Sequence, residues 1–460
     1  MPTENKEPTM TSRISKTIEP FALVHINLVT GDERGTLLPD MMILVGAHGR
    51  IETVAPSADV PVPNEYHVLD GTGKYVMPGL INAHTHLFSQ GRPLNPKMAT
   101  PKGQRITAAI VHSPVGKPYV AATAKNSVRT LLESGVTTIR TLGDIAYEAV
   151  ALRDDIAAGE EVGPHILASG PLLAIPDGHG APLIALEGEA PQDMRANTRR
   201  NIANGVNAVK IAATGGVTDS QVLGEAGAPQ MTVEQMRAIC DEAHDAGILV
   251  AAHAQSAEGV RRALAAGVDT IEHGSRLDDA LIESFKHNPN ALRGYSALIP
   301  TISAGFPLHA FGRDVTGITE IQAENSRTVV DGMLAGARAA HEAGVLVGVG
   351  TDTAMTFVTQ YNTWRELALL VKYAGFTPAE AVRAATRTNA RILNVSGITG
   401  SLDEGKYADM MVLDSNPLDD LSTLAHPKLV VAGGHPVWHP APKRFDDIDR
   451  LLDEAMRREE

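Results

Sequence analysis

The chain has 460 residues, of which 43% are hydrophobic and 20% are charged, a composition typical of a soluble globular protein. Acidic residues outnumber basic ones by 54 to 40, and the resulting net charge of −14 argues against nucleic acid or an anionic membrane as the main partner. The N-terminus lacks the apolar core of a secretory signal, and no apolar run reaches the ~18–20 residues of a membrane span. We therefore expect a cytoplasmic protein.

The two ends of the chain have a β-type texture. Residues 1–20 are polar and predict a disordered segment, whereas short β-type runs alternate with turns over 21–78, as in "FALVHINLVT". The same texture returns over 396–441, so we expect the two pieces to pair into one composite β-sandwich domain. The remaining residues, 442–460, predict a charged amphipathic helix that forms a solvated cap rather than a subunit contact.

The middle of the chain, 79–395, alternates apolar strand-type runs with amphipathic helices, one of which is expected to begin at Ser256 as N-cap. The eight runs span 79–86, 136–143, 165–170, 208–216, 249–254, 270–275, 297–303 and 346–353. Eight strands alternating with helices predict an α/β fold, a (β/α)8 barrel of the TIM type. A doubly wound sheet is the alternative, but it gives no reason for eight strands. The single cysteine, Cys240, falls in a helical segment and is expected to pack in the core.

Selected polar residues stand at the ends of these runs, where barrel enzymes carry their chemistry. The first run ends in "NAHTH", and its two histidines share a face because residues i and i+2 of a strand do. Imidazole and carboxylate are good ligands for zinc and similar divalent ions. The pattern therefore predicts a metal site formed by His84, His86, Lys210, His253, His273 and Asp352.

Lys210 is the unusual member of this set. A metal ion would repel an ammonium group, so the site should favour the neutral amine. A neutral amine can take up CO2 as a carbamate, whose two oxygens can bridge two metals, and we expect Lys210 to be N-carboxylated. His179 lies in the glycine-rich "IPDGHGAP" that follows the third run, on the same barrel face. It is expected either to contact the substrate or transition state or to make a loop hydrogen bond.

With these motifs in order, the chain resembles the amidohydrolase superfamily over nearly its whole length. The resemblance rests on "GKYVMPGLINAHTH", "VKI", "AAHA", "IEHG" and "GTDT", and it is greatest to the imidazolonepropionase-like or prolidase-like branch. It implies that His84, His86 and Asp352 hold a buried metal, that His253 and His273 hold a more exposed one, and that carboxylated Lys210 bridges them. Imidazolonepropionases and nucleobase deaminases of this fold lack the bridging lysine, so Lys210 argues against both activities.

The expected function is hydrolysis of an amide-type C–N bond in a small, largely apolar substrate. Two divalent ions, zinc by default with cobalt or manganese as alternatives, would share a water and lower its pKa. The hydroxide would attack the carbonyl, Asp352 would pass the proton to the leaving nitrogen, and His179 would stabilise the oxyanion. The protein is also expected to be a homo-oligomer.

The substrate stays open between two classes. N-acyl amino acids or dipeptides such as Xaa-Pro would need a basic residue for their carboxylate, whereas aryl ureas, carbamates or thiocarbamates would need only apolar contacts. A deaminase and a non-catalytic binding barrel are the remaining alternatives. The candidate pocket residues are basic (Arg92, Lys97, Lys102, Arg105, Arg313) or apolar (Leu173, Ile175, Met355, Phe357, Trp364).

Overall fold

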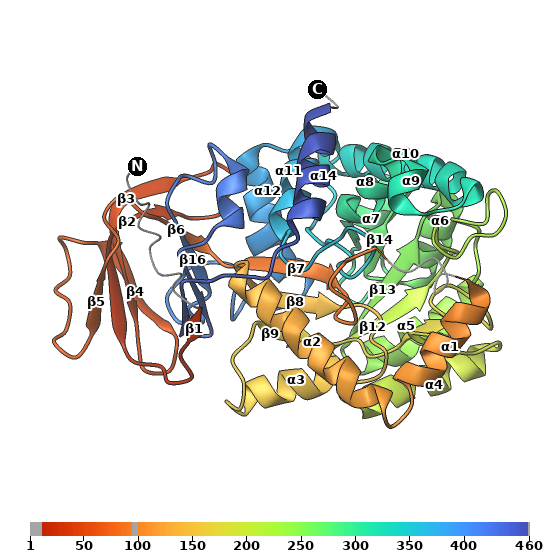
Figure 1. The fold of residues 1–460 in the computed structure, drawn as a ribbon, viewed down its shortest axis with the longest axis horizontal. Helices are drawn as coiled ribbons and strands as arrows, with labels where there is room; N and C mark the ends of the chain where they lie inside the picture. Colours follow the sequence, from red (N-terminus) through yellow and green to blue (C-terminus); the bar gives the residue numbers. More distant parts are fainter. Residues whose placement is uncertain (1–11, 94–99, 459–460) are drawn as a thin grey trace, which may run out of the picture.

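The computed structural model describes residues 12–93 and 100–458. A β domain formed by both ends of the chain lies beside a larger barrel formed by its middle, so the fold class is as predicted (Figure 1). Within the described residues, no helix is both long and apolar enough to cross a membrane.

The β domain joins strands from both ends of the chain in one hydrogen-bonded path, and the pairing of β16 with β6 connects the two ends. Its strands are β1 (Arg13–Ile14), β2 (Phe21–Val29), β3 (Leu37–Val45), β4 (Ile51–Pro56), β5 (His67–Asp70), β6 (Tyr75–Pro78), β16 (Met410–Leu413), β17 (Leu429–Ala432) and β18 (His435–Trp438). Strand β1 pairs with β18 and falls inside the segment expected to be disordered, so that prediction is wrong for residues 13–14, whose backbone completes a sheet edge. Residues 1–11 lie outside the described part.

Strand β2 is irregular at His25, which has a φ of 57° and lies within the first of two irregular stretches in the pairing with β3. The first half of β2 pairs with β5 and the second half with β6, so β2 has two neighbouring strands along the same edge. Bulges of this kind let a sheet turn a corner.

The barrel strands are parallel and follow the predicted runs closely for seven of the eight. They are β7 (Leu80–Thr85), β8 (Val136–Thr141), β9 (His165–Leu167), β12 (Ala208–Ala212), β13 (Leu249–Ala254), β14 (Thr270–His273) and β15 (Ala297–Ile299). Two short strands that the sequence did not predict, β10 (Leu172–Ala174) and β11 (Ala185–Glu187), extend the sheet beside β12.

The eighth run, 346–353, is not a regular strand. It makes one bridge, Leu298 to Val347, and then follows β7 through a hydrogen bond from the Ala83 amide to the Val349 carbonyl at 2.9 Å. The side chain of Asn389 inserts here, because its amide donates to the carbonyls of Ile81 and Val349, both at 2.7 Å. The Asn389 side chain thus replaces part of the backbone hydrogen bonding between neighbouring strands, and the barrel still closes.

Helices surround the barrel strands (Figure 1). They are α1 (Pro101–Val111), α2 (Gly116–Glu133), α3 (Glu148–Ala157), α4 (Pro191–Ala203), α5 (Val233–Asp245), α6 (Ala257–Ala266), α7 (Asp279–Lys286), α8 (Ile302–Ala310), α9 (Arg313–Thr316), α10 (Glu320–Glu342), α11 (Thr363–Ala374), α12 (Pro378–Arg383) and α13 (Asn389–Ile392), with a π-helical turn η1 (Ala384–Thr388) and a 3-10 turn η2 (Leu421–Ala425). As predicted, Ser256 caps α6 by accepting the Gly259 amide, and Cys240 is buried.

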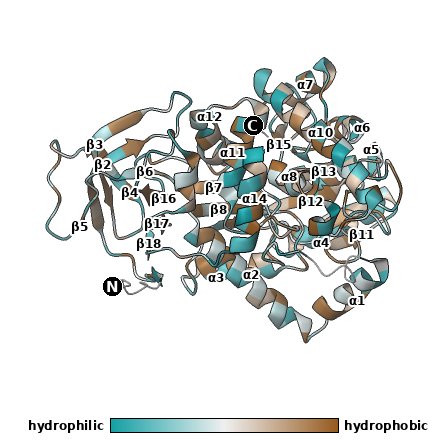
Figure 2. Cartoon of the chain, turned by 45° about the horizontal axis from the view of Figure 1, so that its top comes forward, coloured by the Kyte–Doolittle hydropathy of each residue, from teal (hydrophilic) through white to brown (hydrophobic). Residues whose placement is uncertain are grey.

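The predicted C-terminal helix is α14 (Asp446–Arg458), which lies beside α11 (Figures 1 and 2). Its buried residues Ile448, Leu452 and Ala455 join the main hydrophobic core. Arg365 of α11 pairs with Asp453 at 2.7 Å, so the helix is attached to the barrel by apolar and ionic contacts together.

Candidate active site

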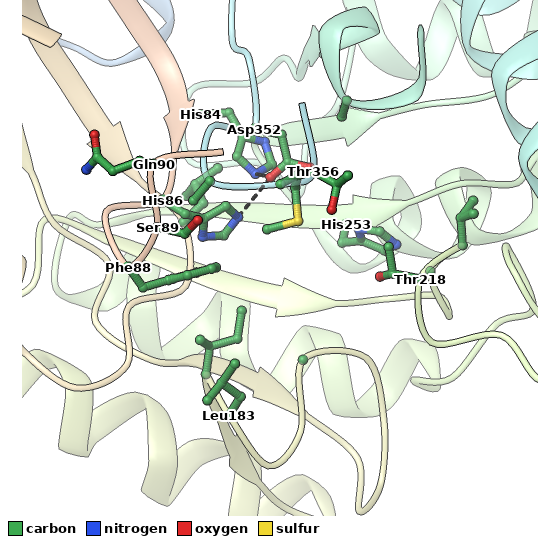
Figure 3. A pocket seen from close by; sticks show the side chains of 18 of the residues that line it. His84, His86, Phe88, Ser89, Gln90, Leu183, Thr218, His253, Asp352 and Thr356 are labelled. Atoms are coloured by element: carbon green, nitrogen blue, oxygen red, sulfur yellow. Dashed lines mark ion pairs between the residues drawn. The ribbon is translucent and has the colours of Figure 1, made fainter. Parts of the chain in front are cut away.

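One cavity of about 1050 Å³ opens at the carboxyl ends of the barrel strands. All seven residues that the sequence proposed as ligands or catalytic groups line it: His84, His86, His179, Lys210, His253, His273 and Asp352. They come from β7 and the residue that follows it, from β12, β13 and β14, from the loop after β10 and from the irregular eighth run, so the barrel gathers residues that are far apart in the sequence. Figure 3 shows part of this arrangement.

His84, His86 and Asp352 converge on one point. Asp352 Oδ1 lies 2.9 Å from His86 Nε2 and 3.3 Å from His84 Nε2. The Nδ1 atom of His86 donates to the Gly143 carbonyl at 3.0 Å, since a carbonyl oxygen can only accept. The Nε2 atom of His86 therefore faces a carboxylate, an arrangement that a proton or a metal cation between the two groups would stabilise. The three side chains offer ligand atoms within 4.8 Å of one another, which fits a divalent metal ion.

The other two histidines are held in the same manner. Thr301 Oγ1 lies 2.7 Å from His273 Nδ1, and the Gly215 carbonyl lies 3.3 Å from His253 Nε2. Burial lowers the pKa of both imidazoles well below the usual value, and His179 adds to the shift at His253. Neutral imidazole is the form that binds metal.

Two of the candidate ligands have a strained backbone. His273 has a φ of 70° and Asp352 a φ of 58°, both in the left-handed region that residues other than glycine seldom adopt. Each such residue costs on the order of 1–3 kcal/mol, and such strain concentrates at functional sites. The strain supports a functional interpretation of this end of the barrel.

Lys210 is buried, and within residues 12–93 and 100–458 its Nζ has no hydrogen-bond partner. Burial lowers the pKa of Lys210 to about 8, with Glu272 and Asp352 opposing the shift. A buried amine without a partner is costly unless it is modified or bound. This unpaired atom fits a carboxylated lysine between two metal ions.

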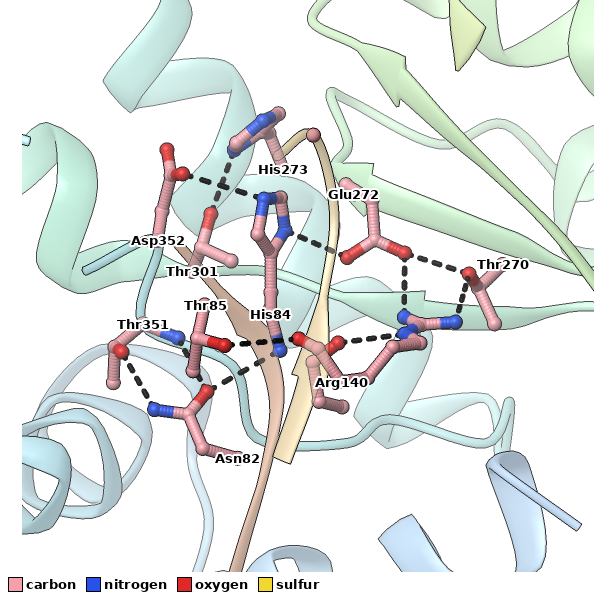
Figure 4. A network of polar contacts seen from close by, with 12 residues as sticks. Asn82, His84, Thr85, Arg140, Thr270, Glu272, His273, Thr301, Thr351 and Asp352 are labelled. Atoms are coloured by element: carbon pink, nitrogen blue, oxygen red, sulfur yellow. Dashed lines mark hydrogen bonds and ion pairs between the residues drawn. The ribbon is translucent and has the colours of Figure 1, made fainter. Parts of the chain in front are cut away.

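A buried ion pair that the sequence analysis missed supports His84 from behind. Glu272 Oε2 lies 2.8 Å from His84 Nδ1, and Glu272 Oε1 accepts from Arg140 at 2.9 Å (Figure 4). Burial alone would raise the pKa of Glu272, but Arg140 and then His84 outweigh it and bring the pKa to about 2. The sequence contained one indication of this ion pair: Arg140 and Glu272 carry opposite charges within two runs that were predicted to be buried strands.

His179 is fixed on three sides. Its ring lies over His253, its Nδ1 contacts the Asp219 carboxylate, and its backbone amide donates to Gln230 at 2.9 Å. A Cβ at Gly216 would lie 2.6 Å from the imidazole, so only glycine leaves room for this ring position. Asp219 was not singled out from the sequence, because it lies in a loop without a periodic pattern.

The predicted substrate contacts are mostly wrong. Of the five apolar candidates only Met355 is among the described lining residues, while Leu173, Ile175, Phe357 and Trp364 pack in or against the core. Arg92, Arg105 and Arg313 form exposed ion pairs and, like Lys102, are absent from the described lining; Lys97 lies outside the described residues. The apolar lining includes Phe88, Leu142, Ile145, Leu172, Leu308, Val329, Val330 and Met333.

Among the described residues, the lysines and arginines that line the cavity, besides Lys210, are Arg129 and Lys443. Arg129 Nε pairs with Glu133 at 2.9 Å. Lys443 makes no ion pair within the described part of the chain; its Nζ lies 5.9 Å from the centre of the Phe445 ring. The C-terminal segment thus contributes a cation that the sequence analysis had assigned to the start of a solvated helix.

Comparisons with known proteins agree with this geometry. A structure of a candidate prolidase from Bifidobacterium longum is 64% identical, covers 95% of this chain and 99% of its own, and superimposes with a TM-score of 0.86. A Xaa-Pro dipeptidase with methionine bound in its active site is 26% identical, with coverages of 91% and 100% and a TM-score of 0.77. Ochratoxinase of Aspergillus niger is 27% identical over 326 residues, which are 65% of this chain and 64% of that protein. This chain therefore spans slightly less than two thirds of ochratoxinase.

The family model described as the amidohydrolase family matches residues 75–437, well over half of the chain. This match includes all seven site residues, the final strands of the β domain and the whole barrel. The family is metal-dependent, and the cluster of His84, His86 and Asp352 agrees with that property. The resemblance drawn from the sequence is confirmed: the chain belongs to the amidohydrolase family, and the solved structures similar to it include prolidase-like amidohydrolases.

Proposed function

We propose that this chain is a dinuclear-metal-dependent hydrolase that cleaves the amide bond of a small N-acyl amino acid or a dipeptide such as Xaa-Pro. The observation that carries the proposal is the convergence of six candidate ligands around one cavity, with the Lys210 amine buried and unpaired within the described residues. The similarity to the candidate prolidase and the Xaa-Pro dipeptidase supports this substrate class.

The candidate ligands divide into two groups. His84, His86 and Asp352 would hold one ion, His253 and His273 the other, and carboxylated Lys210 both; zinc is the expected metal, with cobalt or manganese able to use the same ligands. When bound, such a pair of ions lowers the pKa of a water and polarises the scissile carbonyl.

Asp352 and His179 would act on the proton and the charge of the reaction. Burial would raise the pKa of Asp352, but His84 and His86 outweigh it and hold the pKa well below the usual value, so the carboxylate starts ionised. It can then accept the proton of the attacking water and return it to the leaving nitrogen. His179 contacts Asp219 through Nδ1, so it would donate to the developing oxyanion from Nε2, in the imidazolium form that carries a proton on both nitrogens.

The carboxylate of the substrate needs a cation outside the metal site. Lys443 is the candidate, because it lines the cavity and makes no ion pair among the described residues, whereas Arg129 is already paired with Glu133. This assignment replaces the basic loop residues proposed from the sequence.

A second candidate function is hydrolysis of an aryl urea, carbamate or thiocarbamate at the same site. The observation that favours it is the apolar lining contributed by α8 and α10, including Leu308, Val329 and Met333. Such a substrate would use these contacts without a carboxylate.

The deciding experiment is a substrate panel assayed with the zinc-loaded chain and bicarbonate. One set contains N-acyl amino acids and Xaa-Pro dipeptides, and each is paired with its C-terminal carboxamide; the other contains aryl ureas, carbamates and thiocarbamates. We expect turnover of the first set, with loss of activity in the carboxamides. Turnover confined to the second set would overturn the proposed substrate class in favour of the second candidate. Light scattering and cell fractionation would test the homo-oligomer and the cytoplasmic location, which remain predictions.

A further inference from the structure

We propose that Glu272, held in place by Arg140, is the positioning residue that orients His84 toward the metal site. The inference rests on the proposed metal-dependent function and adds two residues to it. Both lie inside the barrel: Glu272 is on β14, Arg140 is on β8, and the side chains of both are at most 1% exposed.

Glu272 lies close to the candidate ligands, yet both of its oxygens are engaged on the side away from the metal site. Oε1 accepts from Arg140 Nη2 at 2.9 Å and from the Thr270 hydroxyl at 2.6 Å. Oε2 lies 2.8 Å from His84 Nδ1. An ionised carboxylate can only accept, so His84 carries its proton on Nδ1 and presents a free lone pair at Nε2. Glu272 therefore acts through His84 rather than as a ligand.

Among the four candidate histidine ligands, His84 is the one whose outer nitrogen meets a carboxylate. His86, His253 and His273 have a carbonyl or a hydroxyl at the corresponding position. A carboxylate partner makes an imidazole more basic and fixes its ring orientation more firmly than a neutral acceptor does. His84 should consequently depend on its outer partner more than the other three.

Arg140 makes this arrangement possible in a buried site. Its guanidinium reaches across the barrel interior, where Nε donates to the Ala83 carbonyl at 2.7 Å and Nη1 to Thr270 at 3.1 Å, in addition to the bond with Glu272. One side chain thus ties β8 to β14 and to the backbone immediately before His84 (Figure 4). Without Arg140, a carboxylate would be left buried and uncompensated, which is strongly destabilising.

The test measures zinc affinity and stability separately, using the full chain stripped of metal and titrated with zinc against a chromophoric chelator in the presence of bicarbonate. In Glu272→Gln, the side chain either offers only a neutral acceptor to His84 or turns its amide toward Nδ1. We expect the affinity of the tighter zinc site to fall about 10- to 100-fold. Asp409→Asn is the matched control, since Asp409 is a buried carboxylate that holds a histidine which is not a candidate ligand, His165, at 3.0 Å. It should bind zinc like the wild type.

A double variant separates positioning from stability. Replacing a buried ion pair by apolar residues of similar size often restores stability. We therefore expect Arg140→Met/Glu272→Leu to melt above Arg140→Met in the metal-free state while its zinc affinity stays as low as that of Glu272→Gln. Wild-type zinc affinity in Glu272→Gln or in the double variant would overturn the inference. If the double variant does not fold, Glu272→Gln decides alone. Failure of the wild-type chain to bind zinc would instead overturn the proposed function and this inference together.

Discussion

The imidazole of His179 stacks on that of His253, with ring centroids 3.9 Å apart and 24° between the ring planes. His253 is a candidate metal ligand, and His179 was expected either to contact the substrate or transition state or to make a loop hydrogen bond. The contact of His179 Nδ1 with Asp219 leaves Nε2 as the nitrogen available to a substrate. His179 can donate from Nε2 in its imidazolium form, in which both ring nitrogens are protonated. The stacked pair thus places this group beside the candidate metal site without making it a ligand.

Replacing His179 with Gln should lower kcat about 10²- to 10³-fold, because a donor to the developing oxyanion is lost. Zinc content should remain at the wild-type value, since His179 is not expected to bind the metal. Steady-state kinetics and metal analysis of the same preparation check both parts. His287→Gln is a suitable control because its side chain is 76% exposed and pairs with Glu283, on the surface. A parallel loss of zinc in His179→Gln would show that the residue supports the metal site instead.

Replacing Lys443 with Met should raise KM at least about tenfold for substrates that carry a carboxylate, because a charged hydrogen bond or ion pair contributes roughly 1.5–3 kcal/mol. Uncharged amides should be unaffected. The measurement compares KM for each N-acyl amino acid with that for its carboxamide. Lys428→Met is the matched control, since Lys428 is a lysine that pairs with Asp414 at 2.9 Å and is not among the lining residues. An equal change in KM for both substrates would argue against a role for Lys443 in carboxylate recognition.

The fold could be predicted wherever a periodic pattern was long enough. Seven strand runs became barrel strands, and the helix starting at Ser256 begins where its cap requires. The prediction of a strand for the eighth run failed. Asn389, 40 residues away from Val349 in the sequence, supplies hydrogen bonds that a neighbouring strand would have made. Strands of two or three residues, such as β1 and β10, are too short to show a period at all.

The candidate site could be predicted because most of its residues stand at the carboxyl ends of barrel strands. A residue's position there is enough to indicate that its side chain faces the mouth of the barrel. The sequence analysis did not single out Glu272. Strict alternation along the strand would point its side chain away from that of His273, to the outer face of the barrel. The left-handed backbone of His273 breaks that alternation, so both residues face inward at different levels. Substrate contacts could not be predicted, because loop residues such as Trp364 turned into the core while helix residues such as Met333 reached the cavity.

Carboxylation of Lys210 should depend on pH, because CO2 reacts with the neutral amine. With a pKa of about 8, the neutral fraction at pH 7 is roughly 10%, about 200 to 300 times that of an ordinary lysine. At constant dissolved CO2, the carbamate signal of the metal-free chain should therefore rise between pH 6.5 and 8.5, as followed by ¹³C NMR with labelled CO2. Lys210→Met should lack the signal and bind less zinc. A signal that persists in this variant would assign the carbamate to another amine.

A second buried carboxylate, Glu366 on α11, should make the stability of the protein depend on pH. Its oxygens accept the backbone amides of Ile302 and Ser303 and the Ser303 hydroxyl, and so fix the start of α8 beside the cavity. Burial raises the pKa of Glu366 to about 7, although these hydrogen bonds oppose the shift. The folded chain therefore holds this proton more tightly than the unfolded chain, whose carboxyl titrates near 4.5.

A raised folded-state pKa contributes stability that is fully present below about pH 4.5 and is lost as the pH rises through about 7. The difference of about 2.5 pKa units corresponds to roughly 3 kcal/mol. Urea unfolding of the metal-free chain should therefore show the wild type losing stability relative to Glu366→Gln between pH 5 and 8, by up to that amount. Other titrating groups cancel in this difference, because both chains contain them. A difference that stays constant across the range would mean that Glu366 is already ionised at pH 5, and that its hydrogen bonds outweigh its burial.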